Sequence, residues 1–252
     1  FSSEASDVYK RQSVNSLTIG KGSGNVNTNT AVGYQALTNN TTGSINTAIG
    51  YQALRENITG ELNTAFGYQA LRDNTTGQRN AAFGTTSLQD NETGSYNTAI
   101  GFGSLLKNTS GGNNTATGNK SLYLNTTGHS NAAFGDGALH KTGSSYNTAV
   151  GSQALTNNET GELSVSVGYN AGLNNTTSKN TFLGANTNIS PTNATWIEST
   201  AIGYNAQITA SNQIMLGTNT ETVAIPGTLS SDKDILVQDF TIGLGPKSGN
   251  LM

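Results

Sequence analysis

The apolar residues of this chain recur at a constant period instead of following the irregular pattern of a globular domain. The motif Asn-Thr-Ala-(Ile/Val/Phe)-Gly ends at Gly33, and its glycine returns every 17 residues as far as Gly135. Spacings of 16, 17 and 16 residues then lead to Gly184. A fixed short period is typical of solenoids, in which each repeat stacks on its neighbours.

Three apolar columns share this period, and equivalent residues are expected to stack. The alanine column is Ala31, Ala48, Ala65, Ala82, Ala99, Ala116, Ala133 and Ala149; the aliphatic and aromatic column, interrupted by Thr117, is Val32, Ile49, Phe66, Phe83, Ile100, Phe134, Val150 and Val167; the leucine column is Leu37, Leu54, Leu71, Leu88, Leu105, Leu122, Leu139 and Leu155.

A repeat of this length is too short for the helix pairs of common helical solenoids, which need about 33 residues or more. Residues 46–50 alternate polar and apolar side chains as a strand does. Asn-x-Thr-Gly predicts a turn, because Asn and Gly tolerate the left-handed conformation. We therefore predict an all-β fold, a parallel β-solenoid of about eleven coils, each with two short strands and two turns. At roughly 4.8 Å per coil it would be about 50 Å long.

An alanine-lined coil is narrow, so one stack buries little apolar surface. The larger apolar column needs a second surface, which a homotrimer would supply. Either the alanine column or the Ile/Val/Phe column fills each coil, and the other lines the shared axis.

Composition excludes several classes of protein. Hydrophobic residues are 33% of the chain and 31 residues are glycine, but charged residues are only 11% and the net charge is −3, which argues against a disordered chain. No basic surface is available for nucleic acid. Cysteine is absent, which excludes disulfides and thiolate metal sites. The sequence has no run of about 18 apolar residues, so it does not predict a membrane-spanning helix.

The stretch Asn-Thr-Ala-Ile-Gly-Tyr-Gln-Ala-Leu at 46–54 resembles the strand motif of trimeric autotransporter adhesin heads, and similar repeats occur in phage and algal-virus tail-fibre proteins. The resemblance covers about residues 17–220, although those heads commonly have a shorter coil. It implies a left-handed parallel β-roll, three chains around one axis, and a role in attachment at the surface of a virion or cell, outside the cytoplasm.

Four segments are expected. Residues 1–12 match no repeat column and are interpreted as a non-native or disordered leader. Residues 13–227 form the solenoid, with an insertion loop at 185–200. Residues 228–240 are a connector. Residues 241–252 begin a second module, because 240–250 repeat the pattern of 17–25.

Catalytic chemistry is not indicated. The two histidines, His129 and His140, occupy different positions in the repeat and are interpreted as solvated surface. No nucleophile motif, calcium-binding repeat or phosphate-binding loop in a suitable context is present. The sequence therefore predicts a non-enzymatic protein without a cofactor.

Some residues are candidates for contacts with a glycan or protein receptor. Aromatic residues follow the strand glycine in several repeats, and they either hold sugars or pack against neighbouring chains; they are Tyr34, Tyr51, Tyr68, Phe102 and Tyr169. Trp196, in the insertion loop, either contacts a receptor or packs at a change in coil shape. Asn-x-Thr sequons are interpreted first as turns and second as N-glycosylation sites; they begin at Asn40, Asn57, Asn74, Asn91, Asn125 and Asn158.

The leading hypothesis is a rigid structural or attachment module of a viral tail fibre or surface adhesin. The alternative is a carbohydrate-binding module that uses the tyrosine row. An ice-binding solenoid is a minor alternative, because the regular Thr-x-Thr face expected of that class is absent.

Overall fold

The structure, a computed structural model, describes residues 11–14, 17–24, 26–191, 195–218 and 220. The first ten residues of the expected leader, the connector at 228–240 and the module start at 241–252 lie outside this range, as do residues 221–227 of the expected repeat domain.

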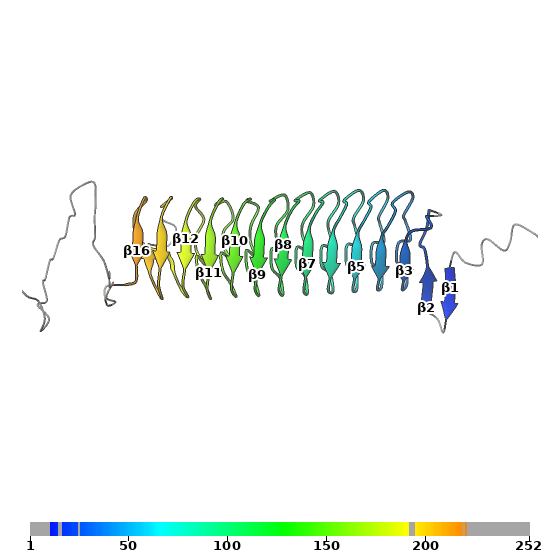
Figure 1. Cartoon of the computed structure of the whole chain (residues 1–252), viewed down its shortest axis with the longest axis horizontal. Coiled ribbons are helices and arrows are strands. Elements are labelled where there is room, and N and C mark those ends of the chain that lie inside the picture. The colour runs from blue at the N-terminus through cyan, green and yellow to red at the C-terminus, as the bar shows by residue number, and fades with distance from the viewer. Residues whose placement is uncertain (1–10, 15–16, 25, 192–194, 219, 221–252) are drawn as a thin grey trace, which may run out of the picture. The chain divides into compact units, whose positions relative to one another are not determined.

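The described chain is all-β, and its strands stack as successive coils of a parallel β-solenoid (Figure 1). The main sheet has 14 strands, of which all but the first two run parallel. The predicted fold class and the number of coils, about eleven, are confirmed; the hand of the coil and the homotrimer stay predictions. The strands are β1 Arg11–Val14, β2 Leu17–Gly20, β3 Thr30–Val32, β4 Thr47–Ile49, β5 Thr64–Phe66, β6 Ala81–Phe83, β7 Thr98–Ile100, β8 Thr115–Thr117, β9 Ala132–Phe134, β10 Thr148–Val150, β11 Val165–Val167, β12 Thr181–Leu183, β13 Asn188–Ile189, β14 Thr200–Ile202, β15 Gln207–Ile208 and β16 Ile214–Leu216.

The first two strands form an antiparallel hairpin that ends the parallel stack. Strand β2 pairs antiparallel with β3, with Ile19 opposite Val32 and Gly20 opposite Ala31. Arg11 and Gln12, which the sequence placed in the leader, belong to β1 and pair with Gly20 and Ile19. The hairpin covers the parallel edge of β3, as sheet edges commonly require.

Most coils contain one three-residue strand instead of the two that the sequence predicted. The rest of each coil consists of turns, whose backbone groups bond to the next coil; for example, the N–H of Leu54 donates to the carbonyl of Ala70 at 3.1 Å. Among the described residues, a second short sheet forms where β13 pairs with β15. Hydrogen bonds between coils therefore replace the second strand.

The alanine and leucine columns both fill the interior of the coil. Ala48, Leu54 and their equivalents through Ala149 and Leu155 are almost completely buried and form one continuous core. The Ile/Val/Phe column lies on the outer face of the sheet, where Phe66 is 54% exposed. The question of which apolar column lies inside is thus answered: alanine is inside and Ile/Val/Phe outside.

A buried asparagine ladder runs beside this core. The Oδ1 atom of Asn80 accepts the backbone N–H of Asn97 at 3.0 Å, and its Nδ2 atom donates to the carbonyl of Gly94 at 2.8 Å. Asn97 repeats the pattern one coil further on, with Asn114 and Gly111. Each side chain therefore satisfies one donor and one acceptor of the adjacent coil.

The asparagines of the sequons form a second buried ladder. Asn74 donates from Nδ2 to Oδ1 of Asn57 at 2.8 Å and to the carbonyl of its own turn glycine, Gly77, at 3.0 Å. These asparagines are not among the residues with a positive φ, so the explanation from left-handed tolerance is wrong. They link the coils from inside.

The left-handed backbone positions lie elsewhere in the coil. Gln52, Leu54 and Leu62 have φ values of +56°, +50° and +59°, and their equivalents in other coils are similar. A side chain in this region costs roughly 1–2 kcal/mol per residue, and asparagine tolerates it best. Leu54 is completely buried, whereas Leu62 is exposed. Burial of the side chain therefore offsets the backbone strain at Leu54 but not at Leu62.

Leu62→Asn is therefore expected to stabilise the coil, by about 0.5–1 kcal/mol. Asn113 and Asn212 already occupy the same position with φ of +59° and +58°. Thermal unfolding followed by circular dichroism should show a higher Tm than in the unaltered chain. The matched variant Leu62→Val should lower the Tm, since a β-branched side chain is worse in this conformation; equal Tm values for the two variants would contradict the strain argument.

The core changes character after Leu155. Phe182 occupies the alanine column, and the leucine column has Gly172, where an added Cβ would lie 2.8 Å from the Phe182 ring and 3.0 Å from Leu155. The large ring thus takes the volume that leucine fills elsewhere. Trp196 packs against this second core cluster and donates from Nε1 to the carbonyl of Ser190 at 3.2 Å.

Candidate binding surface

The outer face of the main sheet is the broadest candidate surface. From Ile45 to Tyr51 the side chains alternate between outside and inside, with Asn46 and Ala48 buried. This alternation follows from the two-residue period of a strand. It places threonine and Ile/Val/Phe columns on the outer face, between an edge column that includes Ile45 and the tyrosine row.

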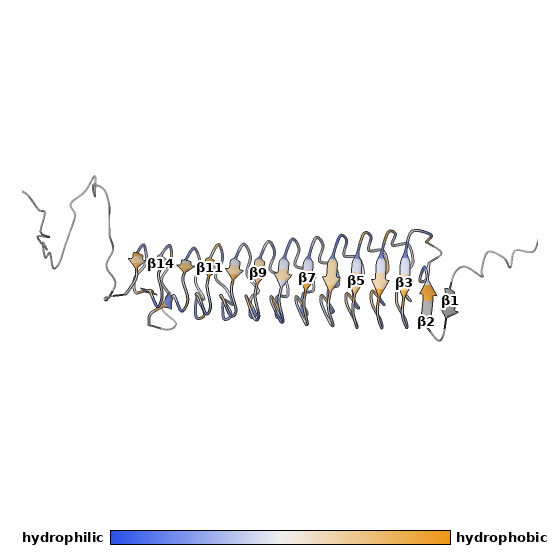
Figure 2. Ribbon diagram, turned by 60° about the horizontal axis from the view of Figure 1, so that its bottom comes forward, coloured by the Kyte–Doolittle hydropathy of each residue, from blue (hydrophilic) through white to orange (hydrophobic). Residues whose placement is uncertain are grey.

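The Ile/Val/Phe column makes an apolar stripe on this face, interrupted at Thr117. In Figure 2, many of the strands are coloured as apolar at their carboxyl ends, where these residues lie. Members with exposed side chains are Phe66, Phe83, Ile100, Phe134, Val150, Val167, Leu183, Ile202 and Leu216. A large exposed apolar patch commonly marks an interaction surface.

The tyrosine row is partly assembled as predicted. Tyr34 and Tyr51 stack with ring centroids 5.4 Å apart, and Tyr51 and Tyr68 with centroids 5.1 Å apart. Phe102 and Tyr169 are exposed in the same column, but Thr85 and several polar residues separate them from the stack. The tyrosines use their ring faces on one another, so the stack presents mainly ring edges and hydroxyl groups.

Three exposed tyrosines were missed by the sequence reasoning. Tyr204 follows Gly203 and extends the aromatic row beyond the insertion. Tyr96 and Tyr146 lie in the edge column of Ile45; Tyr96 accepts a hydrogen bond of 2.7 Å from Arg79, whose guanidinium also lies 5.3 Å from the ring centroid. The period that revealed the other columns could have revealed this one, but its residue types vary too widely.

Trp196 and the sequon asparagines, which the sequence offered as contact or glycosylation sites, are partly or fully buried. Trp196 is partly buried against the second core cluster, which fits its interpretation as a packing residue at a change in coil shape. The sequon asparagines lie inside the coil, where most of their Nδ2 atoms bond to neighbouring ladder members. Glycan attachment would require these groups to leave the folded coil.

A charged edge lies along the turn that follows the leucine column. Lys107 donates to Asp90 at 2.7 Å, and Arg72 pairs with Asp73 and approaches Asp90 at 3.8 Å. The hydrogen bond that Lys107 donates to Asp90, followed by the Coulomb attraction of this carboxylate, raises the pKa of Lys107 above its usual range. The contacts of Asp90 with Lys107 and Arg72 link adjacent coils, whereas the pair Arg72–Asp73 lies within one coil. Ion pairs at the surface each contribute little stability.

The described residues contain no group of three or more His, Asp and Glu side chains that could hold a metal ion. His129 is exposed and packs edge-on against Tyr146, while His140 is partly buried and stacks on Tyr123. The described residues include no helix that is long and apolar enough to cross a membrane.

Comparison with known proteins finds no match: no family model, curated protein or solved structure matches this chain.

Proposed function

We propose that this chain is a non-enzymatic structural and attachment segment of a fibre or adhesin, assembled as a homotrimer and displayed on a virion or cell surface. The observation that supports it best is the exposed apolar stripe, which continues over successive coils of a regular rod. One chain leaves this stripe in contact with water. Two further copies around a common axis would cover it and stiffen the assembly.

The regular hydrogen bonding between coils supports the mechanical part of the proposal. Both asparagine ladders and the in-register strands join each coil to the next. A solenoid built in this way has only nearest-neighbour contacts, so its length can grow by adding coils while its cross-section stays constant. Three parallel copies would also present weak receptor contacts together and increase their combined avidity.

The first test is the solution mass of the full chain. Light scattering should give three times the chain mass of 26.0 kDa. The double variant Phe66→Lys/Phe83→Lys should reduce this mass to that of one chain, because charges on the stripe would be buried at the shared axis. Circular dichroism should show that the coils remain folded.

Ile58→Lys is the matched control, because Ile58 is also exposed but lies in a turn outside the stripe. It should leave the mass unchanged. A monomeric unaltered chain would overturn the homotrimer, and a trimer that persists in the double variant would show that another face forms the contact.

A carbohydrate-binding role for the tyrosine row stays a hypothesis. Sugars commonly stack on aromatic ring faces, and Tyr51 has neighbouring rings on both of its faces. The row therefore gives this alternative less support than the stripe gives to assembly.

A further inference from the structure

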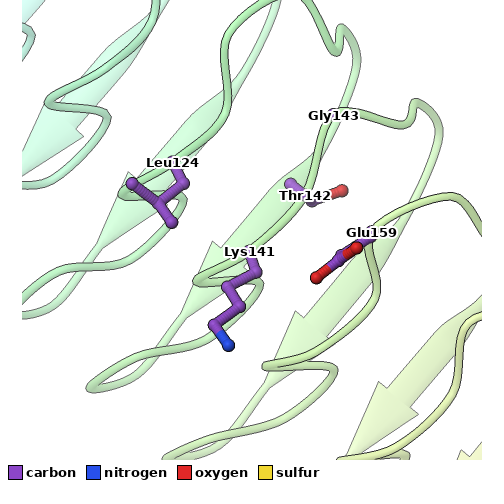
Figure 3. Close-up of a pocket in the computed structure, with 5 residues that line it drawn as sticks. All are labelled: Leu124, Lys141, Thr142, Gly143 and Glu159. Carbon is purple, nitrogen blue, oxygen red and sulfur yellow. The ribbon is translucent and has the colours of Figure 1, made fainter.

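A hollow of about 220 Å³ interrupts the regular surface of the solenoid between the coils that contain Leu124, Lys141 and Glu159 (Figure 3). Thr142 and Gly143 complete its lining. It lies where the spacing of the strand glycine falls from 17 to 16 residues, between Gly135 and Gly151. The hollow is therefore a consequence of one missing turn residue.

Two further departures from the repeat coincide with this place. The first is Thr142, which stands where the buried ladder elsewhere has asparagine; the Oδ1 atom of Asn125, one coil earlier, consequently has no hydrogen-bond partner in the protein. The second is that Ser144 takes the place of the turn glycine: its carbonyl accepts from Asn131 Nδ2 at 2.8 Å, as the carbonyl of Gly128 accepts from Asn114. Gly143 lies beside it in open space, since a Cβ there would meet only the carbonyl of Glu159, at 4.0 Å.

The rim of the hollow carries two ionic groups of opposite sign. Lys141 and Glu159 are exposed, and within the described chain neither side chain makes an ion pair or hydrogen bond. Other charged side chains on this turn, such as Lys107 and Asp90, pair with each other. Figure 3 shows the Lys141 and Glu159 side chains extending from adjacent coils beside the hollow, with Leu124 on the preceding coil.

We infer that this hollow binds a single sugar ring that carries a carboxylate. The ammonium of Lys141 supplies donors for the carboxylate, and Glu159, an acceptor only, takes hydrogen bonds from ring hydroxyls. The exposed Leu124 side chain packs against the apolar C–H face of the ring. The volume is below the roughly 300–1,000 Å³ of sites for larger ligands, which limits the occupant to about one ring.

The site deepens the proposed attachment role and rests on it. It would occur once in each described chain and three times in the trimer, all at the same height along the rod. Weak single contacts would then act together on a surface rich in acidic sugars. The trimer is tested by mass and the sugar site by ligand binding, so the two proposals can fail separately.

Saturation-transfer NMR on the full chain tests the site, with methyl glucuronoside as probe and methyl glucoside as the neutral match. The glucuronoside should bind, and about 2- to 5-fold more tightly than the glucoside, as one exposed charge pair allows. Lys141→Ala should abolish this preference. Lys120→Ala, which removes an exposed lysine outside the hollow, should preserve it.

Gly143→Leu provides the second variant, because it fills the hollow without changing a charge. Gly143 has no positive φ and open space at its Cβ position, so the coil should keep its Tm. Binding of the glucuronoside should fall by at least about 5-fold. Three results would each overturn the proposal: unchanged binding in this variant, equal binding of glucoside and glucuronoside, or displacement of the probe by the free amino acid alanine, which is not a sugar.

Discussion

Gly84→Ala is expected to unfold the middle of the solenoid, with a loss of more than about 3 kcal/mol. Gly84 has a φ of +137°, a region that side chains rarely adopt, and an added Cβ would lie 2.5 Å from the carbonyl oxygen of Gly101 in the next coil. The Cα of residue 84 and the carbonyl of Gly101 belong to closely stacked backbone, so neither can move without separating two coils. Urea unfolding followed by circular dichroism should show a lower midpoint.

Other glycines separate the two causes of this loss. Gly137 has a φ of +62° but its Cβ would meet only Gln153, at 3.9 Å, so Gly137→Ala should show the cost of a left-handed backbone without a clash. Gly77 has no positive φ but its Cβ would lie 2.3 Å from the carbonyl of Gly94, so Gly77→Ala should show the cost of the clash. If Gly84→Ala and Gly137→Ala lose equal stability, close stacking is not what the strand glycine provides.

Asn97→Ala is expected to destabilise the chain by about 1–3 kcal/mol, although Asn97 lies next to a surface turn. The substitution leaves the buried backbone N–H of Asn114, now bonded at 3.0 Å, without a partner. The carbonyl of Gly111 loses one of its two donors but keeps the hydrogen bond of 2.9 Å from Asn108. A buried group left unpaired costs about 1–3 kcal/mol. Thermal and urea unfolding measure the loss.

Asn97→Ser should lose less, because the chain itself places Ser164 and Ser199 in this column, where their hydroxyls bond across the coil. Asn119→Ala, at an exposed asparagine, should change stability by no more than about 0.5 kcal/mol. Comparable losses at Asn97 and Asn119 would show that the ladder does not hold the coils together.

Asn97→Asp adds a pH dependence to the same test. Burial raises the pKa of a carboxyl above its unfolded value of about 3.9, and only the protonated form can donate to Gly111. The folded state then binds more protons than the unfolded state near neutral pH. The loss of folding stability relative to the unaltered chain should be largest at pH 7. It should shrink as the pH falls from 7 toward the unfolded pKa of about 3.9.

The sequence by itself determined the period, the parallel stacking and the number of coils. Each column of alanine, leucine and glycine recurs at one interval, and only in-register stacking of short coils brings such residues together. The shortened turn near Gly143 was also visible as a change in spacing. These features are properties of the repeat, so they do not depend on the details of side-chain packing.

Only the tertiary structure decided which side of the coil each column occupies. Isoleucine and phenylalanine are apolar, yet Phe66 and Phe83 face outward, since strand alternation places them opposite the alanines that fill a narrow interior. Asn57 has the local signature of a turn residue, but its partners belong to the adjacent coils and exist only after stacking. Local propensity contains no information on groups 17 residues away, and those groups determine what is buried.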